Sequence, residues 1–162
     1  MAIAILSWLL AIPLLGVATG LRSLTPMAVL CWFAYLGYLP VDGTWASWTG
    51  RLSVAVVLTV LAVGELVADK FPWIPNRTAP GPLIWRLVLG GLAGSITATA
   101  MDGPGLEGVL LGVVGAGLGA FGGFMIRHDL RETFLCADWP VAVAEDVITV
   151  FFAIVAMHVV TE

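Results

Sequence analysis

Long apolar runs alternate along the whole chain with short stretches that are rich in proline, glycine and charge. Most runs are close to the length of about 20 residues that a helix needs to cross the hydrocarbon of a bilayer. They are apolar all round rather than on one face, as is typical of helices surrounded by lipid. The pattern predicts six segments, at residues 2–20, 24–39, 52–70, 82–101, 106–126 and 139–160.

The second segment is the shortest of the six. About 16 residues barely cover a hydrocarbon core of roughly 30 Å, and Pro26 is typical of the first turn of a new helix. This segment is therefore either a short span or a re-entrant helix.

Composition places the chain among integral membrane proteins. Of its 162 residues, 60% are hydrophobic and 11% are charged, with a mean hydropathy of +1.02. Soluble domains usually carry about 25% charged residues. We expect one all-helical polytopic membrane domain over residues 1–162. No basic block indicates nucleic acid, and no cofactor is expected.

Basic residues favour the six-span topology. Six spans place only Arg51 on one side, with the other basic residues on the opposite side, which the positive-inside rule makes cytoplasmic. Both termini then lie outside. The residues of the basic side are Arg22, Lys70, Arg77, Arg86, Arg127 and Arg131.

Two short matches suggest an internal repeat. A shift of 77 residues pairs "LSWLLAIPLLG" with "LIWRLVLGGLA". A shift of 80 residues pairs "LAVGELVADK" with "VAVAEDVITV" and superposes Glu65 on Glu145. Halves at residues 1–78 and 79–162 with three helices each would form a 3+3 inverted repeat, as in transporters with a site between the repeats. Because the matches are short and the apolar alphabet is small, chance similarity is the alternative.

Acidic side chains within the apolar segments are the candidate chemistry. Glu65 and Asp69 are four residues apart and share one helical face, while Glu145 and Asp146 are adjacent in the last segment. A charged side chain at the bilayer centre costs about 2.5–3.5 kcal/mol on insertion scales. We therefore expect these carboxylates to face one another, a cation or water. Arg22, in "GLRSLTP", is either a partner for them or a positive-inside anchor.

Structural readings remain open for some of these acids. Asp69 and Lys70 are also what the interfacial end of a helix would carry, with the lysine reaching toward the headgroups. Asp146 is also consistent with a first-turn acid at the start of a tilted helix.

Glycines recur at four-residue spacing in two segments. Gly90 and Gly94 lie in the fourth, and the fifth, "EGVLLGVVGAGLGAFGGFM", carries several more. This spacing lets helix backbones approach closely, either within one chain or in a homo-oligomer. In the fifth segment the glycines at this spacing are Gly108 and Gly112, followed by Gly115, Gly119 and Gly123.

The motifs "GLRSLTP", "GELVADKFPWIPNRTAP" and "AEDVI", in this order, resemble an uncharacterised bacterial membrane family, domain of unknown function 4126. The resemblance implies a related fold and a bacterial inner membrane location. It also implies importance for the motif residues Glu65, Asp69, Lys70, Pro72, Glu145 and Asp146. A weaker likeness is to cation/proton exchangers, which carry a glutamate and an aspartate three rather than four residues apart and repeat the Asp-Lys pair.

These observations predict a small transporter or channel coupled to a cation or proton. Its ion site would comprise Glu65, Asp69, Glu145, Asp146 and Arg22, and it would contact membrane lipids. The alternative is a non-transporting scaffold or lipid-binding protein in which the same acids form structural ion pairs. No nucleophile and base pair, metal triad or phosphate loop is visible, so an enzyme is not expected.

Overall fold

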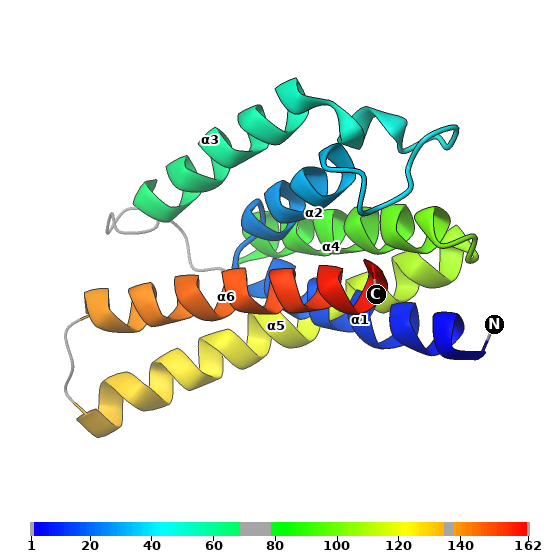
Figure 1. The fold of residues 1–162 in the computed structure, drawn as a ribbon. Coiled ribbons are helices and arrows are strands. Elements are labelled where there is room, and N and C mark those ends of the chain that lie inside the picture. The colour runs from blue at the N-terminus through cyan, green and yellow to red at the C-terminus, as the bar shows by residue number, and fades with distance from the viewer. Residues whose placement is uncertain (1, 69–78, 135–137, 162) are drawn as a thin grey trace.

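The computed structural model describes residues 2–68, 79–134 and 138–161 (Figure 1). The described residues form six α-helices and one short 3₁₀ helix, which confirms the predicted all-helical fold. In chain order the elements are α1 (Ala2–Leu21), α2 (Thr25–Tyr35), η1 (Ser47–Gly50), α3 (Leu52–Ala68), α4 (Pro80–Ala100), α5 (Gly105–Phe134) and α6 (Asp138–Thr161).

Within the described residues, three helical segments are long and apolar enough to cross a membrane. These are Pro80–Ala100, Gly105–Arg127 and Val141–Thr161. Three shorter apolar helical segments accompany them, at Ser7–Leu21, Thr25–Tyr35 and Leu52–Ala68.

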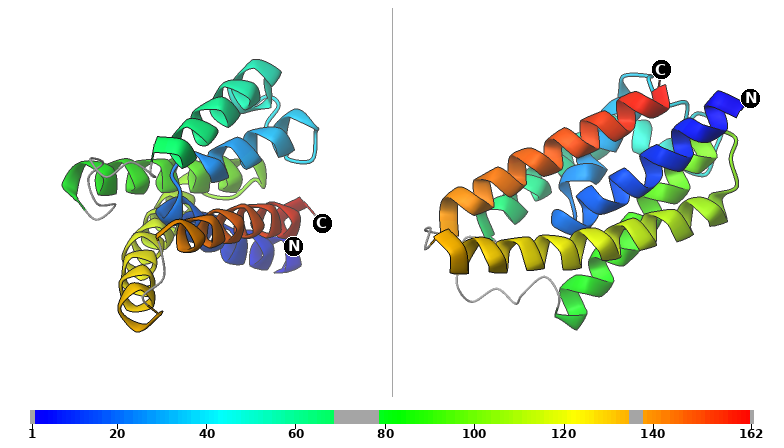
Figure 2. Two further views of the ribbon diagram at one scale, coloured as in Figure 1. Left: turned by 90° about the vertical axis from the view of Figure 1, so that its left-hand side faces the viewer. Right: turned by 90° about the horizontal axis from the view of Figure 1, so that it is seen from below.

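Successive helices run in opposite directions. In Figure 1, α1, α3 and α5 run from right to left and α2, α4 and α6 return from left to right. The two termini consequently lie at the same end of the bundle, as the right-hand view in Figure 2 also shows. This arrangement is the one that six antiparallel spans require. The proposed repeat of residues 1–78 in residues 79–162 stays a prediction.

Two helices differ in length from the sequence prediction. α2 ends at Tyr35 rather than near residue 39, because Gly37 adopts φ +80° and turns the chain out of the helical path. At about 1.5 Å per residue, the 11 residues of α2 extend only about 16 Å, roughly half a hydrocarbon core. α5 continues to Phe134, beyond its apolar run, since "RHDLRETF" contains no proline or glycine to stop it.

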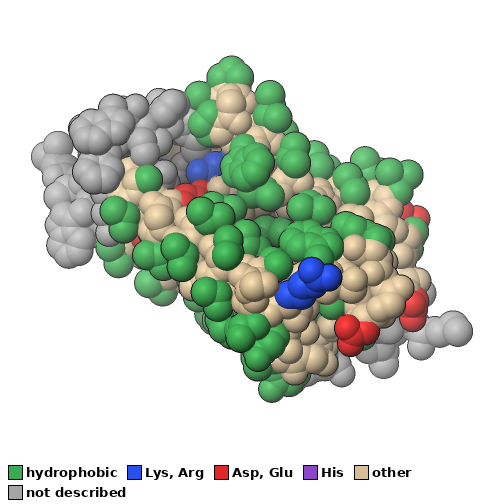
Figure 3. All heavy atoms as spheres, turned by 90° about the horizontal axis from the view of Figure 1, so that it is seen from above, with side chains coloured by type: hydrophobic (Ala, Val, Ile, Leu, Met, Phe, Trp, Pro, Cys, Tyr) green, Lys and Arg blue, Asp and Glu red, His purple; other side chains and the backbone are tan. Residues whose placement is uncertain are grey.

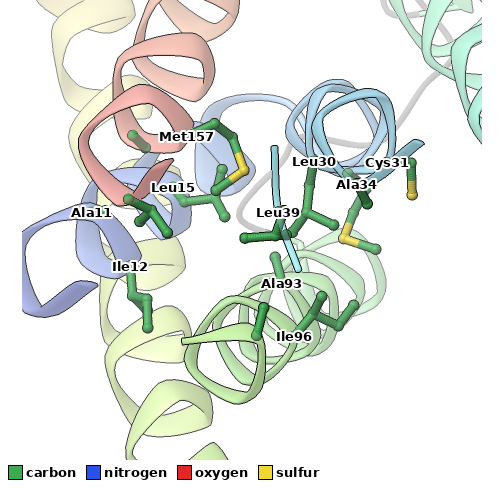
Figure 4. Close-up of a cluster of buried hydrophobic side chains, with 14 of the residues drawn as sticks. Ala11, Ile12, Leu15, Leu30, Cys31, Ala34, Leu39, Ala93, Ile96 and Met157 are labelled. Carbon is green, nitrogen blue, oxygen red and sulfur yellow. The ribbon is translucent and has the colours of Figure 1, made fainter. Parts of the chain in front are cut away.

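The hydrophobic core lies where α1, α2, α4 and α6 meet (Figure 4). Ile12 and Leu15 of α1 are fully buried there with Leu30 of α2, Ile96 of α4 and Met157 of α6. Cys31 is buried in the same cluster as a free thiol, which agrees with the packing role expected for a small apolar side chain.

Glycines bring α1, α4 and α5 into backbone contact. A Cβ atom at Gly16 of α1 would lie 2.6 Å from the carbonyl oxygen of Gly112, and one at Gly90 of α4 would lie 2.8 Å from the same oxygen. A Cβ at Gly94 would likewise collide with Gly108. These close approaches are contacts within one chain. Association of copies through the glycine-rich helices is therefore a separate prediction that these contacts do not support.

Candidate functional site at the junction of α1 and α2

The connection between α1 and α2 is only three residues long, Arg22–Leu24. α1 ends at Leu21 with backbone carbonyls that have no partner in the next turn, and α2 begins at Thr25 with unpaired backbone amides. In a membrane such groups must find partners within the protein. Side chains from two other helices, α3 and α4, supply them.

Glu65 of α3 satisfies the amides at the start of α2. One carboxylate oxygen accepts hydrogen bonds from the backbone amide of Ser23 at 2.9 Å and from its hydroxyl at 2.5 Å. The other accepts from the backbone amide of Leu24 at 2.8 Å. Leu24 is the N-cap residue of α2 and has no polar side chain. Glu65 therefore does from another helix what the glutamate of a capping box does, since it accepts the backbone amide of the N-cap residue.

Arg86 of α4 satisfies the carbonyls at the end of α1. Its Nη1 donates to the carbonyl oxygens of Gly20 at 2.9 Å and Leu21 at 2.6 Å. Its Nη2 lies 3.8 Å from a carboxylate oxygen of Glu65. A cation at a helix C-terminus and an anion at a helix N-terminus both complement the helix dipoles. Arg86 and Glu65 are thus an ion pair that spans the break between two helices.

Arg22, within the junction, reaches α6. Its Nε donates to one carboxylate oxygen of Asp146 at 2.7 Å, and its Nη2 lies 2.6 Å from the same oxygen. The side chain of Arg22 is fully buried and that of Asp146 is 15% exposed. Such an arrangement in low dielectric is a charge-assisted contact that fixes α6 against the end of α1.

Glu145 lies beside Asp146 and is also buried. Its backbone carbonyl accepts a hydrogen bond from the Thr149 hydroxyl at 2.8 Å, one turn further along α6. Glu65 of α3 and Asp146 of α6 thus both lie at one short segment near the start of the chain, where they contact backbone and arginine partners.

The sequence-predicted residues have different outcomes. Arg22 is part of the junction, Glu65 accepts hydrogen bonds from its backbone, and Asp146 accepts one from Arg22. Glu145 is buried next to Asp146. Asp69 lies outside the described residues. Within the described part of the chain, no three His, Cys, Asp or Glu side chains are grouped as metal ligands.

Sequence reasoning gave Arg86 only a topological role, although it is 5% exposed and completes the site. Its position inside the apolar stretch "PLIWRLVLGG" was an available signal, because a guanidinium there needs a buried partner as much as a carboxylate does. Ser23 was also not singled out, since its contribution includes a backbone amide that no sequence pattern marks.

Comparison with known proteins adds a family and no individual relative. Neither the curated proteins nor the solved structures contain a match to this chain. Residues 9–160 match the family described as Domain of unknown function (DUF4126), and this range includes the junction and all the side chains that surround it. Because the match extends over nearly the whole sequence, the chain belongs to this family.

Proposed function

We propose that this protein is a small membrane transporter or channel coupled to protons or small cations, with the junction of α1 and α2 as its ion-responsive site. The observation that carries the proposal is the convergence of Glu65 and Asp146, from helices far apart in sequence, on the short turn between α1 and α2. Helix ends that meet inside the protein and are surrounded by ionisable groups are a common feature of transport sites in membranes.

The depth of the site supports this proposal. Asp146 is five residues beyond Val141, the first residue of the apolar span in α6, which corresponds to about 7.5 Å along the helix. Arg86 is six residues beyond Pro80, the first residue of α4, or about 9 Å. Ionisable groups at such depth are costly to insert and usually mark an ion pathway or a proton relay.

The hydrogen bonds suggest how an ion would act. A proton or cation bound to Asp146 would compete with Arg22 for the same carboxylate oxygen. Binding to Glu65 would compete with the amides that hold the first turn of α2 and with Arg86. Ion binding would therefore loosen the contacts of α3 and α6 with the junction, which couples occupancy to helix position.

The experiment is ion flux through purified protein reconstituted in vesicles, with a pH-sensitive dye inside and an imposed proton or sodium gradient. The Glu65→Gln variant removes the charge, and we expect it to abolish flux. The matched control is Trp32→Phe, which removes the hydrogen bond of 2.9 Å from Trp32 to Thr59 between α2 and α3 and leaves Glu65 in place. The control should retain flux.

Two results would overturn the proposal. One is a wild-type protein that moves neither protons nor cations under either gradient. The other is flux that Glu65→Gln and Trp32→Phe reduce equally, since the effect would then come from weakened packing of α2 against α3 and not from the carboxylate.

A second candidate is a non-transporting membrane scaffold or lipid-binding protein. The hydrogen bonds of Glu65 favour this candidate, because both of its carboxylate oxygens already accept from the junction. In that case the site is a structural brace, and no cation should raise the melting temperature of the protein in detergent. A transporter site should instead show a melting temperature that rises with the concentration of its cation.

For either candidate we propose a non-catalytic role and a multi-pass location in the bacterial inner membrane. Membrane lipids are the expected partners, together with a proton or small cation in the transport case.

A further inference from the structure

An open apolar groove of about 400 Å³ lies between α2, α3 and α4. It exists because α3 packs mainly against α2 and η1, so that the face of α3 turned toward α4 is left uncovered. Figure 3 shows the molecule from the side on which α3 lies, and hydrophobic side chains cover most of that surface. The lining residues include Met27 on the floor, Val57 and Leu58 on α3, and Leu89 and Leu92 on α4.

One end of the groove carries a positive charge. Trp48 and Ser53 line this end, and Arg51 lies between them in the chain. Arg51 is exposed and makes no ion pair with any described residue. Toward the junction the groove is lined by the apolar side chains of Leu24, Leu61 and Trp85.

The charged side chains of the segments around Arg51 have the opposite sign. The connection between α2 and α3, which contains Arg51, lies at the end of the bundle where the termini and the α4–α5 connection are found (Figures 1 and 2). The exposed charged side chains of the neighbouring connections and of the first turn of α5 are acidic, namely Asp42, Asp102 and Glu107. Among these described side chains, Arg51 is the one that attracts an anionic headgroup.

We infer that the groove binds one acyl chain of an anionic phospholipid, with the phosphate of the headgroup at Arg51. The volume falls within the range of roughly 300–1,000 Å³ that is usual for small-molecule sites, and the lining suits hydrocarbon. The guanidinium supplies donors with the geometry that phosphate prefers. Trp48 beside it is a side chain typical of the headgroup level.

Native mass spectrometry of the full chain in detergent tests this inference. The protein is titrated with phosphatidylglycerol or with phosphatidylcholine, and lipid adducts are counted. We expect tighter binding of phosphatidylglycerol by wild type. Arg51→Gln should weaken it about fivefold, as expected for the loss of one basic residue worth about 1 kcal/mol. Arg51→Lys should retain most of the preference.

Two exposed valines provide a matched pair for the groove itself. Val57 lines the groove on α3 and is 55% exposed, whereas Val114 on α5 is 61% exposed and lies outside it. Val57→Trp should fill the groove and reduce the adducts of both lipids, while Val114→Trp should leave them unchanged.

Three outcomes would overturn the inference. Equal phosphatidylglycerol binding by wild type and Arg51→Gln would remove the headgroup site. Equal effects of the two tryptophan variants would remove the groove. A dimer in wild type that Val57→Trp dissociates would show that a second copy of the chain occupies the groove.

Discussion

Glu65 on α3 caps the first turn of α2 by accepting a hydrogen bond of 2.8 Å from the backbone amide of Leu24. A helix start within the membrane therefore depends on a side chain that is 41 residues away in the sequence. Together with Arg86 at the end of α1, this contact makes the break between α1 and α2 compatible with hydrocarbon.

The first prediction concerns the cap itself. Glu65→Gln keeps the size of the side chain but turns one acceptor into an NH₂ group that faces an amide or hydroxyl donor. We expect a loss of about 1–3 kcal/mol in the free energy of unfolding. Thermal unfolding in detergent would measure it. Glu107→Gln, an exposed acid in the first turn of α5, should change stability by no more than about 0.5 kcal/mol. Equal stability of the two variants would contradict the capping role.

The second prediction concerns the ion pair of Arg22 and Asp146. Arg22→Met alone should destabilise the fold by about 3–5 kcal/mol, because it leaves a buried carboxylate without its guanidinium. Arg22 also makes a further interaction, so the pair has to be isolated by a double-mutant cycle. Adding Asp146→Leu should recover part of the loss, with a coupling energy above about 1 kcal/mol. Strict additivity of the two substitutions would show that the contact contributes nothing.

The third prediction concerns glycine packing. Gly94→Ala places a methyl group against the backbone of Gly108 and should separate α4 from α5 at a cost of about 1–3 kcal/mol. Gly64→Ala on α3 is the matched control, because a Cβ there has nothing within 4 Å. It should stabilise the protein by up to about 1 kcal/mol through helix propensity. Melting temperatures that move in the same direction in both variants would oppose this account.

The fourth prediction concerns topology. Single cysteines at Asp42 and Glu107 should be labelled by a membrane-impermeant thiol reagent from the same side as tags on the two termini. A cysteine at Asp129, near the far end of α5, should be labelled from the opposite side. All three positions are exposed. Labelling of Asp42→Cys from the side opposite to the N-terminal tag would show that the short α2 does not complete a crossing.

Much of the fold could be predicted from the sequence. The apolar runs predict all six α-helices, because a helix that crosses lipid needs a continuous run of apolar residues, and such runs are easy to locate in the sequence. The end of α2 was predicted about four residues too late. The apolar run continues past Tyr35, but the positive φ of Gly37 is a backbone property that hydrophobicity does not report.

The candidate site was predicted in part. The sequence identifies Glu65, Asp146 and Arg22 because a charged side chain inside an apolar run is costly to insert and must be shielded or paired. Their partners could not be assigned, since they depend on how the helices pack. From the sequence Arg86 is only a topology signal, because its contacts with Gly20 and Leu21 depend on how α4 packs against α1.

By itself the sequence determined that this chain is a bundle of apolar helices and which few charged residues must be shielded. Both properties follow from the free energy of transfer between water and hydrocarbon, which is set residue by residue. Only the tertiary structure decided that the shielding occurs at the break between α1 and α2. Hydrogen bonds between a carboxylate of α3 and the backbone of α2 depend on distances of about 3 Å across helices, and these arise only when the packed helices fix them.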